Sequence, residues 1–193
     1  MTWISKKFDE TIRKKGHYQW RFGDRNLELD WNEMIKLFDS HPMEKVGGNV
    51  NKMNYQLQNF GERASAPKQL LNMVKQLKKK FHKNIISLIC FGSFGKTAQS
   101  FNIHRDTMDV IYMQGLGEVD LSIWKWIGED GIRLPDNIDH DRDKNVKLVF
   151  KKRFKKYDII WIPRGTYHLI QPVGTRTGFS FGVEGDPDPS TYI

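Results

Sequence analysis

Six short runs of β-branched and aromatic residues dominate the second half of the chain, beginning at Ile85. Clusters of Gly, Pro, Asn and Asp separate them, as turns separate strands. The runs are IISLICFGSF (85–94), DVIYMQ (109–114), EVDLSIWKW (118–126), VKLVFKKRF (146–154), DIIWIP (158–163) and GFSFGV (178–183). Residues 130–145 are dense in Asp, Asn and Arg and predict a loop between two strands. The second half is therefore predicted to be a series of closely spaced strands.

The first half shows helical periodicity instead. Residues 31–38 carry apolar side chains at helical spacing after Asp30, and Glu33 follows Asp30 by three residues, as in a capping box. A second helix is predicted from Pro67 to Phe81, because apolar residues recur three or four positions apart and lysines fill its last turn. These two segments are predicted to be amphipathic helices.

The remainder of the first half is less regular. Residues 18–22 alternate aromatic and polar side chains, which predicts a short strand. Gly47 and Gly48 predict a turn, and residues 49–60 fit a loop and an edge strand equally well.

Helices followed by strands favour a mainly β fold with helical cover (α+β), an antiparallel β-sandwich or barrel covered by helices on one side. A chain of 193 residues has the length of a single domain. Within residues 1–193 we expect a helical and mixed N-terminal cover at 1–82, a β core at 83–185 and a C-terminal tail at 186–193.

The formal net charge is +8, and short runs such as Lys78–Lys80 and Lys151–Lys156 hold much of the excess. Such a surface either attracts an acidic partner, nucleic acid included, or only solvates one face of the protein. Cys90 is the single cysteine, which excludes an internal disulfide and a zinc site built from cysteines. No apolar stretch has the length of a signal peptide core or of a membrane span, so we expect a reducing, cytoplasmic setting without a membrane partner.

Candidate chemistry centres on the stretch FNIHRDTMD, residues 101–109. His104 and Asp106 stand two residues apart just before a predicted strand, and His168 follows the strand DIIWI and a Pro-Arg-Gly turn. Two imidazoles and one carboxylate can cover one face of an octahedral metal ion and leave the other face open, as in non-haem Fe(II) oxygenases. Because rigid strand ends hold ligands well, His104, Asp106 and His168 are the candidate metal ligands and catalytic centre.

The pattern H-x-D-x-x-D-V, followed much later by D-I-I-W-I-P-R-G-T-Y-H, resembles the JmjC and ribosomal-oxygenase group of 2-oxoglutarate-dependent oxygenases. The resemblance covers residues 87–183. It implies a double-stranded β-helix (cupin or jelly-roll fold) with the N-terminal helices packed outside the barrel. It also implies a hydroxylase that uses Fe(II), 2-oxoglutarate and O2, with succinate and CO2 as by-products. By this resemblance His104, Asp106 and His168 bind the iron.

The co-substrate site departs from the JmjC pattern. In that group a lysine on the strand after H-x-D pairs with the far carboxylate of 2-oxoglutarate, whereas the nearest equivalent here is Glu118. Related oxygenases use an arginine after the distal histidine, so Arg176 is the first candidate, supported by Ser180 on the same strand face. Lys125 is the second candidate. Tyr112 is expected to line the pocket.

Three interpretations remain at this stage. The first is an oxygenase acting on a protein, another macromolecule or a small molecule, and relatives of this kind often form homodimers through helices outside the barrel. The second is a cupin-type metal-binding protein, an isomerase or a non-catalytic small-molecule binder, without oxygenase activity. The third is a binding module that uses the basic surface on nucleic acid.

Overall fold

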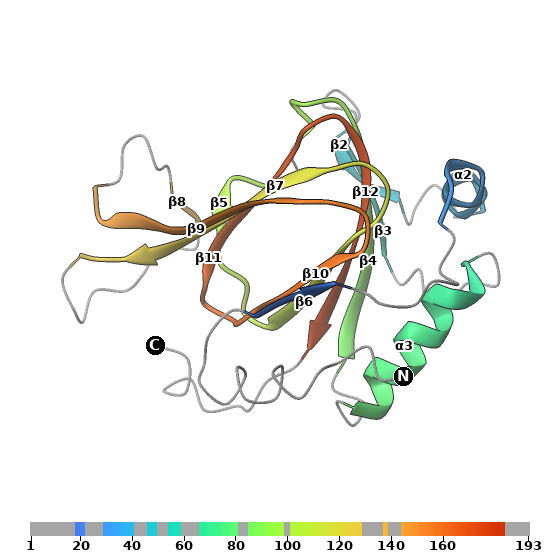
Figure 1. Cartoon of the computed structure of the whole chain (residues 1–193), viewed down its shortest axis with the longest axis horizontal. Coiled ribbons are helices and arrows are strands. Elements are labelled where there is room, and N and C mark those ends of the chain that lie inside the picture. Colours follow the sequence, from blue (N-terminus) through green and yellow to red (C-terminus); the bar gives the residue numbers. More distant parts are fainter. Residues whose placement is uncertain are drawn as a thin grey trace.

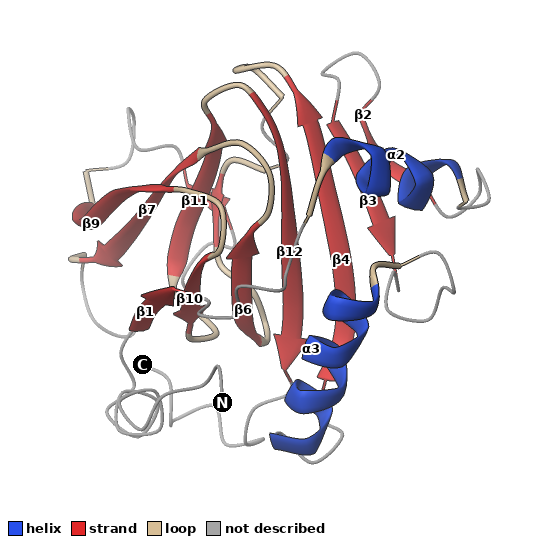
Figure 2. Ribbon diagram, turned by 45° about the vertical axis from the view of Figure 1, so that its right-hand side comes forward, coloured by secondary structure: helices blue, strands red, loops and turns tan. Residues whose placement is uncertain are grey.

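The computed structural model describes residues 18–21, 29–40, 46–49, 54–58, 66–80, 85–98, 101–128, 137–138 and 144–183. Two sheets face each other and enclose the interior of a barrel, and two helices lie outside the larger sheet (Figure 1, Figure 2). Every described strand pair is antiparallel. The architecture is the expected double-stranded β-helix with helical cover.

The larger sheet has seven strands and the smaller sheet five among the described residues. In spatial order the larger sheet contains β1 (Tyr18–Arg21), β10 (Asp158–Ile162), β6 (Asp109–Gln114), β12 (Thr175–Val183), β4 (Ile85–Phe94), β3 (Asn54–Gln58) and β2 (Val46–Asn49). The smaller sheet contains β8 (Asn137–Ile138), β5 (Ile103–His104), β11 (Tyr167–Pro172), β7 (Val119–Trp126) and β9 (Val146–Phe154).

Strand alternation divides the apolar residues between two layers. On β6, Ile111 and Met113 face the helices, whereas Val110 and Tyr112 face the interior between the sheets. The interior cluster joins both sheets, since it also contains residues of β7, β9 and β10. Both faces of β6 are therefore buried. Its polar side chains that enter the barrel, Tyr112 and Gln114, form hydrogen bonds there.

The helices α2 (Trp31–Asp39) and α3 (Lys68–Lys80) cover the outer face of the larger sheet. The Oδ1 atom of Asp30 accepts a hydrogen bond from the Glu33 amide at 2.8 Å, which confirms the predicted N-terminal cap of α2. The buried face of α2 consists of Met34 and Leu37. Ile35 is 58% exposed, because it lies a quarter turn away from that face. No helix in the described part of the chain is both long and apolar enough to cross a membrane.

The structure confirms the strand predictions and corrects them at several points. The predicted turn at Gly47 and Gly48 is wrong, because both residues belong to β2, which pairs with β3. Strand β12 begins at Thr175, three residues before the predicted run, and it therefore includes Arg176. Strand β11, which carries His168, was not predicted as a strand. Phe22, Met53 and Phe81 lie outside the described residues.

Candidate metal centre

The three candidate metal ligands converge on the smaller sheet. His104 on β5 stands directly opposite His168 on β11, although 64 positions separate them in the numbering. Asp106 follows His104 by two residues, just beyond the end of β5. One ligand atom from each of the three side chains lies within 4.8 Å of the others. The antiparallel register therefore builds the site from distant parts of the chain.

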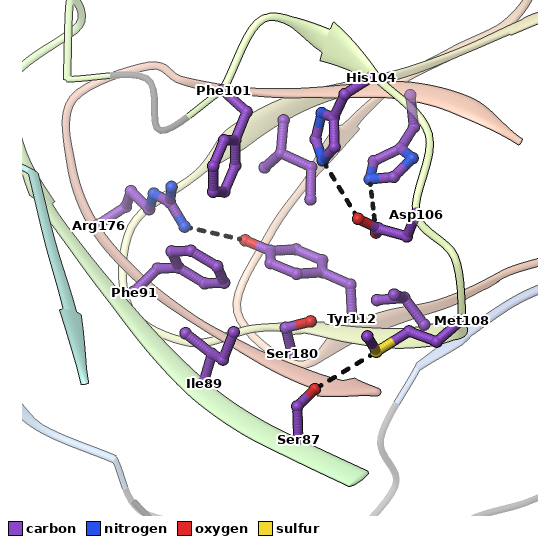
Figure 3. Close-up of a pocket in the computed structure, with 13 residues that line it drawn as sticks. Ser87, Ile89, Phe91, Phe101, His104, Asp106, Met108, Tyr112, Arg176 and Ser180 are labelled. Carbon is purple, nitrogen blue, oxygen red and sulfur yellow. Dashed lines mark hydrogen bonds and ion pairs between the residues drawn. The ribbon is translucent and has the colours of Figure 1, made fainter. Parts of the chain in front are cut away.

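The Asp106 carboxylate faces the imidazole of His104 (Figure 3) and also that of His168. His104 Nε2 is 3.7 Å from Asp106 Oδ1, and His168 Nε2 is 3.5 Å from Asp106 Oδ2. The centroids of the imidazole rings are 4.4 Å apart. Both imidazoles direct Nε2 toward the same carboxylate, as ligands of one ion must.

Backbone carbonyls determine the tautomer of both histidines. His104 Nδ1 lies 2.8 Å from the carbonyl oxygen of Asn102, and His168 Nδ1 lies 2.9 Å from that of Thr166. A carbonyl oxygen can only accept, so Nδ1 carries the proton in each neutral ring and donates it. The Nε2 lone pairs are thus free for a metal ion, with the outer-shell support that metal-bound imidazoles usually have.

Burial keeps His168 neutral. Desolvation, followed by the nearby His104, lowers the pKa of His168 to about 4, against the opposing effects of Asp106 and the Thr166 carbonyl. A neutral imidazole is the form that binds a metal. His168 is therefore ready to act as a ligand at neutral pH without first losing a proton.

Two backbone amides of the Pro-Arg-Gly turn donate hydrogen bonds to the stretch that carries Asp106, one to a carbonyl oxygen and one to a side chain. The Gly165 amide donates to the carbonyl oxygen of Asp106 at 2.9 Å, and the Arg164 amide donates to Asp109 Oδ1 at 2.8 Å. Gly165 has φ 74°, a conformation that glycine adopts without strain. The turn before β11 and the loop after β5 are thus held together, which positions the ligands from both.

A cavity of about 200 Å³ opens beside the three ligands between the two sheets. Its other described lining residues come mainly from β4, β6, β11 and β12. They are Ser87, Ile89, Phe91, Phe101, Met108, Val110, Tyr112, Ile170, Arg176 and Ser180. The lining is largely apolar, with a few polar groups at defined points, which is the usual composition of a site for a small ligand.

Arg176 is the most unusual residue of this cavity, because its side chain is only 1% exposed. The guanidinium lies across the cavity from the metal ligands, where Nη1 donates to the Tyr112 hydroxyl at a long 3.5 Å (Figure 3). It also lies 5.6 Å from the centre of the Phe91 ring. Nε has no hydrogen-bond partner, and no carboxylate of the described residues pairs with the charge. A buried charge is costly without such a partner, so the site is suited to an anion.

Gln114 determines how Tyr112 meets this arginine. Gln114 Nε2 donates to three backbone carbonyls, those of Leu116, Gly117 and Thr177. Its Oε1 atom therefore faces the Tyr112 hydroxyl, which donates to it at 2.5 Å. Since that proton is already engaged, the hydroxyl oxygen is left to accept from Arg176.

Of the other candidate residues, three line the cavity and one does not. Tyr112, Arg176 and Ser180 line the cavity, and the last two share one face of β12 as predicted. Lys125 does not line it and is exposed on β7. Sequence reasoning missed Phe91 and Phe101, whose only signal is their position on or beside predicted strands.

The donor set fits ferrous iron. Two imidazole nitrogens and one carboxylate oxygen on one side, with a cavity on the other, would leave coordination positions of such an ion open.

Comparison with known proteins identifies a matching family and structures of similar fold. A family model described as the JmjC domain matches residues 69–188. No curated protein sequence matches the chain significantly.

Solved structures of YcfD from Escherichia coli are similar in fold. The ribosomal oxygenase YcfD in complex with cobalt and 2-oxoglutarate matches with a TM-score of 0.66 at 14% identity, over 97% of this chain and 53% of that one. Another YcfD structure matches with a TM-score of 0.65 at 16% identity, over 94% and 53% of the two chains. YcfD in complex with cobalt and succinic acid matches with a TM-score of 0.63 at 14% identity, over 97% of this chain and 52% of that one. The chain spans about half the length of these relatives.

Proposed function

Because the chain belongs to the JmjC domain family, we propose that it is an Fe(II)- and 2-oxoglutarate-dependent oxygenase that hydroxylates a C–H bond. A macromolecule, with protein as the first candidate, is the proposed substrate class, since the similar YcfD is a ribosomal oxygenase.

One observation supports this proposal above the others. A metal-ligand triad and a buried guanidinium that no described carboxylate neutralises face the same cavity. A protein that only held a metal ion would have no need for the second feature, and a buried charge costs free energy. An elongated dianion would satisfy both ends, one at a metal ion held by the triad and the other, a carboxylate, at the arginine.

Each residue then has a defined task. His104, Asp106 and His168 hold the iron, which together with 2-oxoglutarate supplies the activation of O2 when bound. Arg176 binds the far carboxylate of 2-oxoglutarate, and Ser180, four residues further along β12, adds a hydroxyl to the same cavity. Tyr112, whose own proton goes to Gln114, accepts from Arg176 and keeps the guanidinium aimed into the cavity. The apolar lining excludes water, which strengthens these charged contacts.

The test is spectroscopic and needs no macromolecular substrate. Under anaerobic conditions, addition of Fe(II) and then 2-oxoglutarate should give a visible metal-to-ligand charge-transfer band. Admission of O2 should then give slow turnover to succinate. Asp106→Ala serves as the comparison and should show neither, because it removes a ligand at the centre of the triad.

Two results would separate the alternatives. Metal binding without the band, at any 2-oxoglutarate concentration, would leave a cupin-type metal-binding protein and refute the oxygenase proposal. A band of equal strength in Asp106→Ala would show that iron binds elsewhere and refute the assignment of the triad.

A further inference from the structure

The basic side chains of β9 are not explained by the proposed function. From Lys144 to Lys156 the chain carries seven lysines and arginines and no acidic residue. Strand β9 is the last strand of the smaller sheet, and no described strand pairs with its outer edge. In Figure 1 the ends of β7 and β9 extend away from the body of the barrel. The charge therefore follows an edge strand of the smaller sheet.

Only part of this charge has a partner within the described residues. Arg153 forms ion pairs with Asp120 and Glu118, at 2.5 Å and 3.3 Å respectively. Lys156 donates to the carbonyl oxygen of Leu29 and lies over a tyrosine ring. The other five lysines of the run are exposed and form no ion pair with described residues: Lys144, Lys147, Lys151, Lys152 and Lys155. The same holds for Lys125 on the neighbouring strand β7.

The strand register places two of these lysines against each other. Lys125 on β7 stands directly opposite Lys147 on β9. Like charges directly opposite one another destabilise an antiparallel pair, so this arrangement lowers the stability of the free protein. An anion bound across the pair would turn the repulsion into attraction.

The pair lies on the face of the sheet that carries the metal ligands. Ile123 on β7 is the register partner of His168, and Lys125 follows Ile123 by two residues, so all three side chains share one face. Strand geometry puts the Cα atom of Lys125 on the order of 8 Å from that of His168. Lys152, opposite Leu121, adds a third positive charge to the same face.

From this placement we infer that the β7–β9 edge binds the phosphate backbone of a nucleic acid beside the metal site. Each nucleotide contributes one negative charge, and a backbone contact requires no fixed register with the protein strand. An acidic peptide pairing with β9 is disfavoured, because the register shift between Ile123 and Trp124 breaks the regular ladder near Val149. The inference does not depend on oxygenase activity.

The experiment measures binding of a fluorescein-labelled oligouridylate by fluorescence anisotropy, with no iron or 2-oxoglutarate present, over a series of salt concentrations. The test variant replaces four lysines of the edge by glutamine: Lys125→Gln, Lys147→Gln, Lys151→Gln and Lys152→Gln. The control variant removes the same charge from four exposed lysines elsewhere: Lys36→Gln, Lys68→Gln, Lys75→Gln and Lys96→Gln.

The edge variant should bind at least tenfold more weakly than the unmodified protein, whereas the control should change by less than threefold. Loss of the three phosphate contacts of Lys125, Lys147 and Lys152 should also reduce the slope of log affinity against log salt by about 2. Equal losses in the two variants would mean that only net charge matters and would overturn the inference. So would a failure of the unmodified protein to bind at about 50 mM salt, or equally strong competition by oligoglutamate of the same charge.

Discussion

The Arg176→Met substitution is expected to make the ligand-free protein more stable while removing its response to 2-oxoglutarate. Arg176 is 1% exposed and no described carboxylate neutralises it, so its charge opposes folding. Methionine fills a similar volume with an unbranched apolar chain. A residue retained for binding rather than for stability should show this pattern.

The size of the effect follows from the contacts. Moving an ion into a protein interior costs several kcal/mol after relaxation. The Phe91 ring 5.6 Å away returns up to roughly 2 kcal/mol, and the long hydrogen bond to Tyr112 returns less than about 1 kcal/mol. A net gain of about 2 kcal/mol on substitution corresponds to a rise in Tm of roughly 4–8 °C for a chain of this size.

The affinity for 2-oxoglutarate should fall in the same variant whose stability rises. Charge-assisted hydrogen bonds contribute about 1.5–3 kcal/mol each, so loss of a two-pronged contact should weaken 2-oxoglutarate binding by roughly a hundredfold or more. For the unmodified metal-loaded protein, 2-oxoglutarate at about 100 times its Kd adds about 2.7 kcal/mol of stability.

Thermal unfolding of both proteins, with and without 2-oxoglutarate and with Co(II) present throughout in place of iron, measures the two effects together. Lys125→Met is the matched comparison, because it removes the same charge from the other cation that the sequence offers. Metal affinity should be unchanged in both variants. An Arg176→Met protein that is less stable and still responds to 2-oxoglutarate would refute the reasoning, and loss of the response in Lys125→Met alone would transfer the role to that residue.

Three further results are expected. Gly178→Ala places a methyl group against the ring of Tyr112, so it should raise the KM for 2-oxoglutarate in succinate assays while metal binding persists. Gly174→Ala, where the added methyl meets open space, should change neither this KM nor metal binding. The pKa of His168 is lowered to about 4 in the folded protein, so the unfolded state binds more protons between about pH 6.5 and 4. The stability of the metal-free protein should therefore fall as the pH drops through this window. In thermal unfolding, a His168→Gln variant should show a flatter dependence of Tm on pH. Lys147→Glu replaces a cross-strand repulsion by an attraction and should stabilise the protein by up to about 1 kcal/mol in urea unfolding; an unchanged midpoint would argue against that repulsion.

Local patterns were enough to predict most of the β core. The runs 85–94, 109–114 and 146–154 coincide with β4, β6 and β9, because their β-branched and aromatic residues alternate or are buried on both faces. Strand β11 was missed, since the run Tyr167–Pro172 does not alternate apolar and polar residues and gains its partners only from β5 and β7. The glycines of β2 were misread as a turn for the same reason, because pairing with β3 overrides their local preference.

The spacing of the chain by itself determined the metal ligands that we assign, since two ligands two residues apart and a third after a rigid turn form a recognisable pattern. It could not choose between Arg176 and Lys125, because alternation specifies a face of a strand and not whether another layer covers that face. Tertiary structure separates the two side chains: Arg176 is buried and lines the cavity, whereas Lys125 is exposed on β7 and does not line it. The hydrogen bond from Arg176 to Tyr112 and the facing pair Lys125 and Lys147 are relations between different strands, and only folding brings those strands together.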